Sequence, residues 1–257
     1  MKCVVYSSKD VAGQNIAEAL ISKGFEINDS VFEGNEVFQR ENWELIQTDV
    51  ELIYAEHLND LNYEEVIFAS RHSAASGKPT LTAHACGNFG EADYGGQKRQ
   101  ISKASANTMC NIFREMASYK GEHEVSLEVT HHGPFIDIPH CWIELGSNTI
   151  QWKDKKAADF LADCIIKGID SEMQTPSAIG IGGNHYAATF SKYEGEYAFG
   201  HIIPKYAQKY LNLKIVKQMI EMTFPEPEFI AIDKKGVAQQ SKVQELVKNL
   251  GKEVILL

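Results

Sequence analysis

Short apolar runs rich in β-branched residues recur along the chain, and each is bounded by polar residues or glycine. Such runs are typical of β-strands, because branched side chains pack well on a pleated surface. The pattern predicts strands at residues 3–6, 66–69, 80–84, 125–130, 141–145, 178–181 and 229–232. An eighth run at residues 254–257 would return the C-terminus to the sheet.

Between these runs, apolar residues recur at the three- and four-residue spacing of amphipathic helices. The clearest helix begins after Asp10, whose carboxylate can cap the first turn, and continues to Gly24 with Ile16 and Leu20 on its apolar face. The same spacing predicts helices from Ser102 to residue 119, at 154–167 and at 237–250. Strands that alternate with helices indicate an α/β domain built in layers.

No linker rich in proline, glycine or serine divides the chain. We therefore expect a single domain that spans residues 1–257. Residues 33–63 are acidic and only weakly periodic, so we expect a hairpin or a small insertion there.

Composition narrows the class of protein. The 257 residues are 44% hydrophobic and 23% charged, which is ordinary for a globular protein. The N-terminus lacks the long apolar stretch of a signal peptide, and no run approaches the ~18 apolar residues of a membrane-spanning helix. Five widely spaced cysteines without a CxxC motif argue against disulfides and against a four-cysteine zinc site. We expect a soluble, cytoplasmic protein with reduced thiols and no membrane partner.

The formal net charge of −10 disfavours sequence-independent binding of nucleic acid over the whole surface. A local basic patch can nevertheless hold RNA, although most such groups are solvated surface charge. Two groups of cationic residues are candidates, namely Lys98, Arg99 and Lys103, and Lys205, Lys209, Lys214 and Lys217.

Five of the nine histidines fall in four short segments, each at a predicted strand end or turn, where functional residues often lie. In the first segment, Arg71 and His72 follow a predicted strand. The planar guanidinium of Arg71 can bind a phosphate or carboxylate of a ligand, or it can pair with an acidic neighbour.

The second segment contains Thr82, His84 and Asn88. Thr82 and His84 share one face of a predicted strand, because side chains alternate with a period of two. His84 lies near the carboxyl end of that strand, the end that faces the ligand crevice in open α/β sheets. Asn88 follows a glycine and can serve either a tight turn or a substrate.

The third segment combines His131 and His132 with Glu144 of a nearby apolar strand. A carboxylate within an apolar strand needs a partner, because burying it unpaired is costly. Histidine with glutamate is a plausible set for general-base or metal chemistry, and a buried hydrogen bond that only holds the sheet is the alternative. Since adjacent strand residues point to opposite faces, we expect His131 to face away from the pocket that His132 enters.

In the fourth segment, Gly182 and Gly183 precede His185 and Tyr186. Glycines allow backbone to approach a ligand closely, and their N–H groups could hold a developing oxyanion. The GxGxxG and P-loop patterns are absent, so nucleotide binding of those kinds is not indicated. The HExxH and GxSxG motifs are absent as well.

In order and spacing, these segments resemble the archaeal and plant type of D-aminoacyl-tRNA deacylase, also called D-tyrosyl-tRNA deacylase. The matching motifs lie between about Ser70 and Tyr206 and are Ser70-Arg71-His72, Ser76-Gly77-Lys78-Pro79, Leu81-Thr82 with His84, Gly87-Asn88, Thr130-His131-His132-Gly133-Pro134, Glu144-Leu145-Gly146 with Trp152, and Gly182-Gly183 with His185-Tyr186-Ala187. Ala188 departs from the family pattern, which usually has a proline there, and this affects a turn more than the chemistry.

The resemblance implies a three-layer α/β/α fold with a mixed sheet, similar to peptidyl-tRNA hydrolase and phosphorylase-like proteins. It also implies a monomeric, zinc-dependent hydrolase that cleaves the ester between a D-amino acid and the 3′ end of tRNA. Candidate zinc ligands are His84, His132 (or His131), His185 and Glu144. Without zinc, one of these histidines would be the general base and Glu144 would orient it.

Substrate binding is expected from a wider set, namely Arg71, His72, Thr82, Asn88, Gly182, Gly183 and Tyr186, with Lys98, Arg99 and Lys103 against the acceptor end of tRNA. Two other interpretations stay open. One is a peptidyl-tRNA hydrolase-like enzyme or another metal-assisted hydrolase on the same scaffold. The other is a non-enzymatic RNA-binding module, which the acidic charge disfavours.

Overall fold

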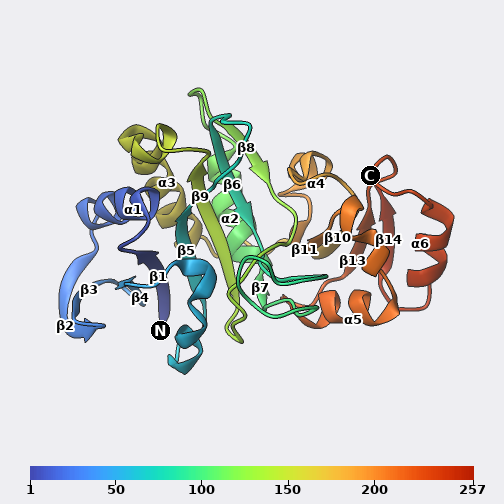
Figure 1. Cartoon of the computed structure of the whole chain (residues 1–257), viewed down its shortest axis with the longest axis horizontal. Coiled ribbons are helices and arrows are strands. Elements are labelled where there is room, and N and C mark those ends of the chain that lie inside the picture. The colour runs from blue at the N-terminus through green and yellow to red at the C-terminus, as the bar shows by residue number, and fades with distance from the viewer.

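Two β-sheets lie side by side, and helices flank both of them (Figure 1). The computed structural model describes every residue from Met1 to Leu257. The strands are β1 (Lys2–Ser7), β2 (Glu26–Phe32), β3 (Asn35–Arg40), β4 (Trp43–Thr48), β5 (Val66–Arg71), β6 (Thr80–His84), β7 (Ala104–Ser105), β8 (Glu124–Leu127), β9 (His140–Gly146), β10 (Ser177–Ile181), β11 (Ala198–Ile203), β12 (Thr223–Phe224), β13 (Phe229–Ile232) and β14 (Glu253–Leu256). The α-helices are α1 (Val11–Ser22), α2 (Ala106–Met116), α3 (Lys155–Ile169), α4 (Ala188–Tyr193), α5 (Leu213–Glu221) and α6 (Gln240–Val247). None of them has both the length and the hydrophobicity that a bilayer crossing requires.

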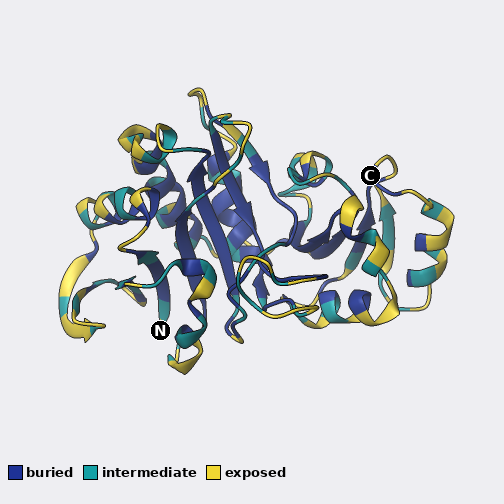
Figure 2. Ribbon diagram, viewed as in Figure 1, coloured by how far each residue is buried: buried dark blue, intermediate teal, exposed yellow.

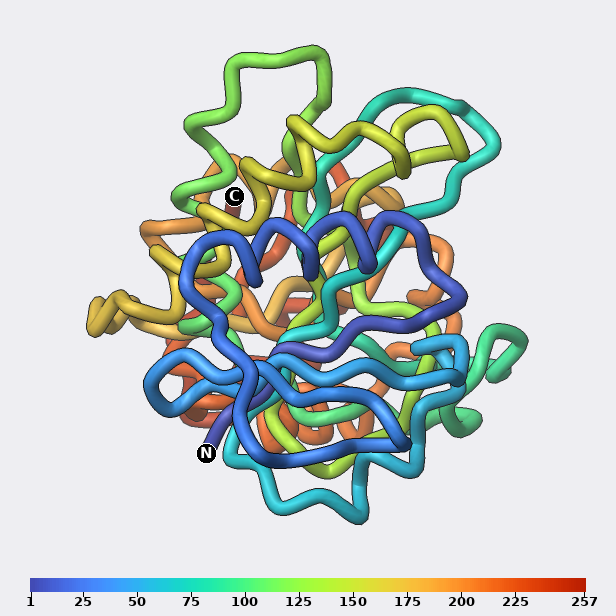
Figure 3. Tube along the Cα trace, turned by 90° about the vertical axis from the view of Figure 1, so that its left-hand side faces the viewer, coloured from blue at the N-terminus to red at the C-terminus, as the bar shows by residue number.

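The larger sheet has ten strands and is mixed, as predicted. Its main path runs in the order β12-β7-β9-β5-β1-β4-β3-β2. The central strands β4, β1, β5 and β9 are parallel, whereas β6 pairs antiparallel with β9 and parallel with β8. Strands β2, β3 and β4 form an antiparallel edge at the N-terminal end of the molecule, which faces the viewer in Figure 3.

One face of this sheet packs against α1, α2 and α3 and forms the largest apolar core. Burial is deepest along the central strands, which Figure 2 shows in dark blue. Alternate residues of each strand point to this face, so it is lined by apolar side chains such as Ile67, Ile143 and Leu81. Helix α1 begins as predicted, because one carboxylate oxygen of Asp10 accepts hydrogen bonds from the backbone N–H groups of Ala12 and Gly13.

A glycine is required where α1 crosses β5. A Cβ atom on Gly13 would lie 2.5 Å from the backbone oxygen of Ala69, which is too close for any other residue. The other carboxylate oxygen of Asp10 accepts hydrogen bonds from the Ser70 hydroxyl at 3.0 Å and from the Arg71 N–H at 2.7 Å. The start of the helix is thereby tied to the end of β5.

The smaller sheet is fully parallel and has the order β11-β10-β13-β14. One of its faces forms a separate apolar core with α5 and α6, in which Ile179 and Ile230 meet Met219 and Val247. The other face carries small and aromatic side chains, including Phe199, that join the core of the larger sheet. The sequence analysis predicted β10, β13 and β14 but missed β11, α4 and α5.

Several predicted boundaries were wrong. The strand predicted at residues 125–130 ends at Leu127, and the helix predicted from Ser102 starts only at Ala106. The Ser102 hydroxyl bonds to the backbone oxygen of Pro134 instead of capping a helix, because the chain first pairs with neighbouring strands through β7. The helix predicted at 237–250 is shorter, since Val237 is buried in the core of the smaller sheet. Residues 33–63 carry a hairpin, as expected, together with short 3₁₀ turns.

Candidate active site

The face of the larger sheet opposite the helices carries polar residues at the centre of three strands. In the register of the sheet, Glu144 of β9 lies between Ser70 of β5 and Thr82 of β6. Two residues along, Trp142 lies between Phe68 and His84, and the rings of Phe68 and Trp142 stack at 4.6 Å. The period of two that sends apolar residues toward the helices therefore sends Glu144, Thr82 and His84 together to the other face.

A second buried carboxylate, Glu128, follows directly after β8. The segment around it is joined to the segment that follows β10: the N–H of Val129 bonds to the oxygen of His185 at 3.0 Å, and the N–H of Ala187 bonds to the oxygen of Leu127 at 2.8 Å. These bonds bring His185 from the smaller sheet to Glu128 of the larger one. The distance from His185 Nε2 to Glu128 Oε2 is 2.9 Å.

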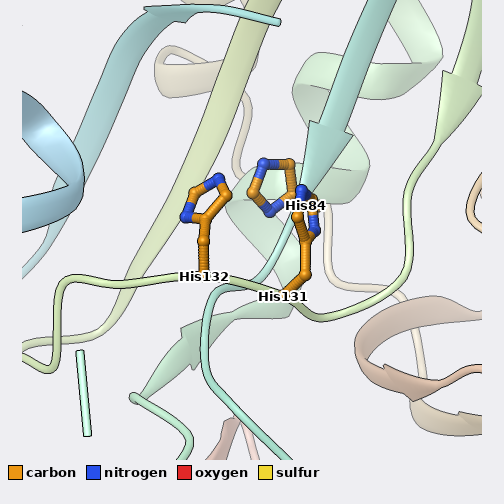
Figure 4. A group of neighbouring side chains, drawn as sticks. All are labelled: His84, His131 and His132. Atoms are coloured by element: carbon orange, nitrogen blue, oxygen red, sulfur yellow. The ribbon is translucent and has the colours of Figure 1, made fainter. Parts of the chain in front are cut away.

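Three more imidazoles gather at the end of β6, as Figure 4 shows for His84, His131 and His132. The ring centroids of His84 and His131 are 4.4 Å apart, and those of His131 and His132 are also 4.4 Å apart. In each residue Nδ1 lies within hydrogen-bond distance of a backbone carbonyl, at 3.1 Å for His84, 2.8 Å for His131 and 2.6 Å for His132. In a neutral ring, donation from Nδ1 fixes the tautomer and leaves the Nε2 lone pair free.

The prediction that His131 faces away from the pocket of His132 was wrong. It assumed that a strand runs through both residues, but β8 ends at Leu127 and His132 has a positive φ of 45°. Both side chains line the same cleft.

His72 lies between the two carboxylates. Its Nδ1 is 2.9 Å from Glu128 Oε1 and 3.5 Å from Glu144 Oε2, and its Nε2 is 2.9 Å from the hydroxyl of Tyr186. Burial opposes a charge on His72, but the two carboxylates outweigh it and raise its pKa to about 11. Burial likewise opposes a charge on Glu144, and its imidazole partners His72 and His84 nevertheless lower its pKa to about 2.

Two of the imidazoles, His131 and His132, are held neutral. Burial and the neighbouring His84 lower the pKa of His132 to about 4, and the same two causes move the pKa of His131 well below its ordinary value. Glu128 stays ionised, because its imidazole neighbours lower its pKa in spite of its complete burial. The site thus combines two ionised carboxylates with the neutral imidazoles of His131 and His132.

Donor atoms here are close enough together to bind a metal ion. Three groups have ligand atoms within 4.8 Å of one another, namely His84, His131 and His132; His72, Glu128 and His185; and His84, Glu128 and Glu144. The four ligands predicted from sequence do not form one group, because His185 and Glu144 fall in different sets. Glu128 belongs to two of the three groups and was absent from the prediction.

A cleft of about 670 Å³ opens above these residues. His131, His132, His185 and Glu144 line it, together with His72. Its outer wall includes polar and aromatic side chains, among them Arg71, Asn88, Glu91, Asp93, Tyr94 and Tyr206.

Three predicted substrate-binding residues, Arg71, His72 and Asn88, line the cleft. The Arg71 guanidinium lies over the Trp152 ring at 5.4 Å and is 3.3 Å from Glu51. Thr82 and Tyr186 lie behind the cleft surface instead. The Thr82 hydroxyl is 3.5 Å from Glu144, so it contacts the site through that carboxylate, as Tyr186 does through His72.

The predicted oxyanion role of Gly182 and Gly183 was wrong. The N–H of Gly182 bonds to the oxygen of Ile203 at 2.9 Å within the smaller sheet, and neither glycine lines the cleft. A Cβ on Gly236 would lie 2.1 Å from the nitrogen of Gly183, so the backbone at Gly183 packs against the backbone at Gly236.

The predicted basic patch is divided. Lys98 pairs with Glu91 at 2.7 Å and Lys103 pairs with Asp137 at 2.9 Å, so both charges have acidic partners. Arg99 has no such partner, and its guanidinium lies 5.9 Å from the centroid of the Tyr210 ring.

Glu128 could have been found from the sequence. It stands among Val125, Leu127 and Val129, and the argument that singled out Glu144 as a carboxylate within an apolar strand applies to it equally.

Comparison with known proteins agrees with the resemblance of the motifs. Residues 59–255 match the family model described as D-aminoacyl-tRNA deacylase. A D-aminoacyl-tRNA deacylase of Archaeoglobus fulgidus is 37% identical over 99% of this chain and 96% of its own, and one of Pyrococcus furiosus is 34% identical over 99% of both. A crystal structure of a conserved protein of unknown function superposes with a TM-score of 0.92 at 34% identity, covering 100% of this chain and 95% of that one. The chain therefore belongs to the D-aminoacyl-tRNA deacylase family.

Proposed function

We propose that this protein hydrolyses the ester bond of D-aminoacyl-tRNA and releases free tRNA and a D-amino acid. The observation that carries the proposal is the convergence of five imidazoles and two ionised carboxylates on the floor of a cleft of about 670 Å³. An aminoacyl ester is hydrolysed by water once a nearby group accepts a proton from that water. Relatives that carry the deacylase name match the chain over its full length.

We further propose that the site binds Zn²⁺. The free Nε2 atoms of His84, His131 and His132 approach one another, while His84 Nε2 is buried without a hydrogen-bond partner. Metal-binding histidines commonly donate their other N–H to a carbonyl, as all three do here. Glu128 supports the same conclusion, because both of its oxygens are buried and make no hydrogen bond of good geometry.

Two groups with no residue in common are candidates to hold the metal. The first is His84, His131 and His132, and the second is His72, Glu128 and His185. Bound Zn²⁺ supplies Lewis acidity, which polarises an ester carbonyl and makes water a better nucleophile at neutral pH.

The residues of the chain provide the orientation and the negative charge. Glu144 and Glu128 hold His72 between them, and the Tyr186 hydroxyl fixes the far side of that ring. If the second group holds the metal, the Nε2 of His132 is free and faces the cleft, where it can accept a proton from a water beside the ester. Arg71, at the rim, is suited to a phosphate or carboxylate oxygen of the substrate.

The direct test is hydrolysis of D-tyrosyl-tRNA compared with L-tyrosyl-tRNA by the purified protein. We expect turnover of the D-ester and rejection of the L-ester, because a cleft that clashes with one enantiomer excludes it by shape. Equal hydrolysis of both esters, or turnover of an N-blocked aminoacyl-tRNA in place of the D-ester, would contradict the proposal.

Zinc binding is tested by the metal content of the protein and by its activity after chelation. Elemental analysis of the purified protein should find zinc, and removal by a chelator should abolish hydrolysis and lower the melting temperature, because a ligand that binds only the folded state stabilises it. Re-addition of Zn²⁺ should restore both. Full activity in a zinc-free sample would leave a histidine base as the mechanism.

A tRNA substrate points to the cytoplasm as the site of action. The resemblance to the family implies a monomer, and we propose that a monomer is the active form. Light scattering during turnover conditions would detect a larger assembly.

A further inference from the structure

A second hollow of about 200 Å³ adjoins the cleft and takes no part in the chemistry described above. The two hollows share four lining residues, Asn88, Glu91, His131 and Tyr206. They therefore meet beside His131, and a chain of nucleotides whose end is held in the cleft would extend directly into the second hollow.

The second hollow is aromatic and carries unpaired positive charge. Tyr206 forms one wall with 59% of its surface exposed, and Tyr210 forms another. Two cations flank the Tyr210 ring, with Lys209 Nζ at 4.9 Å and Arg99 Cζ at 5.9 Å from its centroid. Neither Lys209 nor Arg99 has a carboxylate within 4.0 Å, in a protein whose net charge is −10.

The arrangement is built by the backbone. A Cβ on Gly90 would lie 2.5 Å from Cε2 of Tyr210, so only glycine lets the ring lie flat against the chain there. The N–H of Arg99 donates to the oxygen of the same Gly90 at 3.0 Å, which holds Arg99 beside that ring. The one acidic residue of the lining, Glu91, is paired with Lys98 at 2.7 Å.

We propose that the second hollow binds an unpaired nucleotide next to the esterified one, with its base stacked on Tyr206 and its phosphate held by Arg99 and Lys209. Aromatic platforms with cations along a groove are the general means of binding single-stranded nucleic acid, because every base has a face that stacks. That the nucleotide belongs to the 3′ end of tRNA rests on the proposed function, whereas binding of a single-stranded RNA end does not.

The test uses an uncharged RNA hairpin with a fluorescent label and a four-nucleotide 3′ overhang, and the same hairpin without the overhang. Binding to the full chain is followed by fluorescence anisotropy. We expect the overhang to tighten binding. Tyr206→Ala should lower the affinity for the hairpin with the overhang by about 5- to 100-fold, the usual range for one stacked base. Tyr206→Phe keeps the ring and should bind within about twofold of the wild type, since stacking needs no hydroxyl.

The two cations are tested by salt. Arg99→Gln and Lys209→Gln should each flatten the slope of log K against log salt concentration by about 0.7, if each neutralises one phosphate. Two matched controls should change neither quantity: Tyr54→Ala, an exposed tyrosine that lines neither hollow, and Lys120→Gln, an exposed lysine without an ion pair.

In the hydrolysis assay, Tyr206→Ala should raise KM for D-tyrosyl-tRNA and leave kcat unchanged, because binding energy is lost equally before and during the reaction. Wild-type affinity of Tyr206→Ala for the overhang hairpin, or equal affinity of the wild type for both hairpins, would overturn the inference. Overhang-dependent binding without any hydrolysis would uphold it while the proposed function fails.

Discussion

The strands β5, β9 and β6 have two faces of opposite character. Toward α1, α2 and α3 they present only apolar side chains, such as Ile143 and Leu81, at full burial. Toward the cleft the same strands present Glu144, Thr82 and His84, which are buried as deeply but are polar. Burial of the apolar face stabilises the fold. Burial of the polar face costs free energy, because every buried polar group needs a partner.

Packing against the helices therefore holds the strands in register, and this allows the other face to carry buried polar and charged side chains. A shift of one residue in register would exchange the two faces and leave Glu144 among the helices. Substitutions on the two faces should therefore have opposite signatures, with activity lost on one and stability lost on the other.

The largest effect is expected on the polar side. Glu128→Gln removes the negative charge that three imidazoles surround, so hydrolysis of D-aminoacyl-tRNA should fall by about 10²- to 10⁴-fold. The matched control is Glu124→Gln, at the start of β8, which is exposed and 3.7 Å from Lys78. Activity of Glu128→Gln within a few-fold of this control would mean that the carboxylate is only structural.

On the apolar side the signature should reverse. Ile143→Ala empties a fully buried position against the helices, so the free energy of unfolding should fall by about 2–5 kcal/mol in a urea titration. Its kcat, measured where the variant is fully folded, should stay near the wild-type value. A kcat loss as large as that of Glu128→Gln would show that the two faces are not separable.

A pH-dependent effect is expected at Glu194, a carboxylate without the imidazole neighbours of Glu128 and Glu144. Glu194 has one buried oxygen without a partner, and burial raises its pKa to about 8. Between the ordinary carboxyl pKa of about 4.3 and this value, the unfolded chain loses the proton and the folded chain keeps it, so stability falls as pH rises through this range. Glu194→Gln cannot ionise and should escape this loss.

The advantage of Glu194→Gln over the wild type should therefore grow from about 1 kcal/mol at pH 5 to about 5 kcal/mol at pH 8.5, measured by urea unfolding. Glu196→Gln, an exposed neighbour, serves as the control. An advantage that is the same at both pH values would exclude titration of Glu194 as its cause.

Local patterns predicted the parts of the fold that local chemistry decides. Asp10 caps α1 because its carboxylate bonds to the next N–H groups, and period-two alternation correctly placed Thr82 and His84 on one face. The sheet position of β11 depends on its pairing with β10, from which α4 separates it in the chain, so propensity alone did not reveal it. Strands β2 and β3 form a local hairpin, but they are polar and largely exposed, so they lack the apolar runs that identified the other strands.

The same division holds for the site. His84, His132 and Glu144 stood out as polar residues at strand ends or within apolar runs. The grouping of their donor atoms depends instead on where β8 stops and on the bonds that bring His185 to Glu128. No spacing along the chain records those contacts, because they join segments more than fifty residues apart.

The two backbone bonds between the segments at Leu127–Val129 and His185–Ala187 have a consequence for how the molecule can be monitored. They join the segment that follows β10 to the larger sheet, so breaking them should move His185 away from Glu128. The catalytic rate therefore reports whether the two sheets stay in contact. Hydrogen exchange at the amides of Val129 and Ala187, one in each of the two segments, would report the same opening directly.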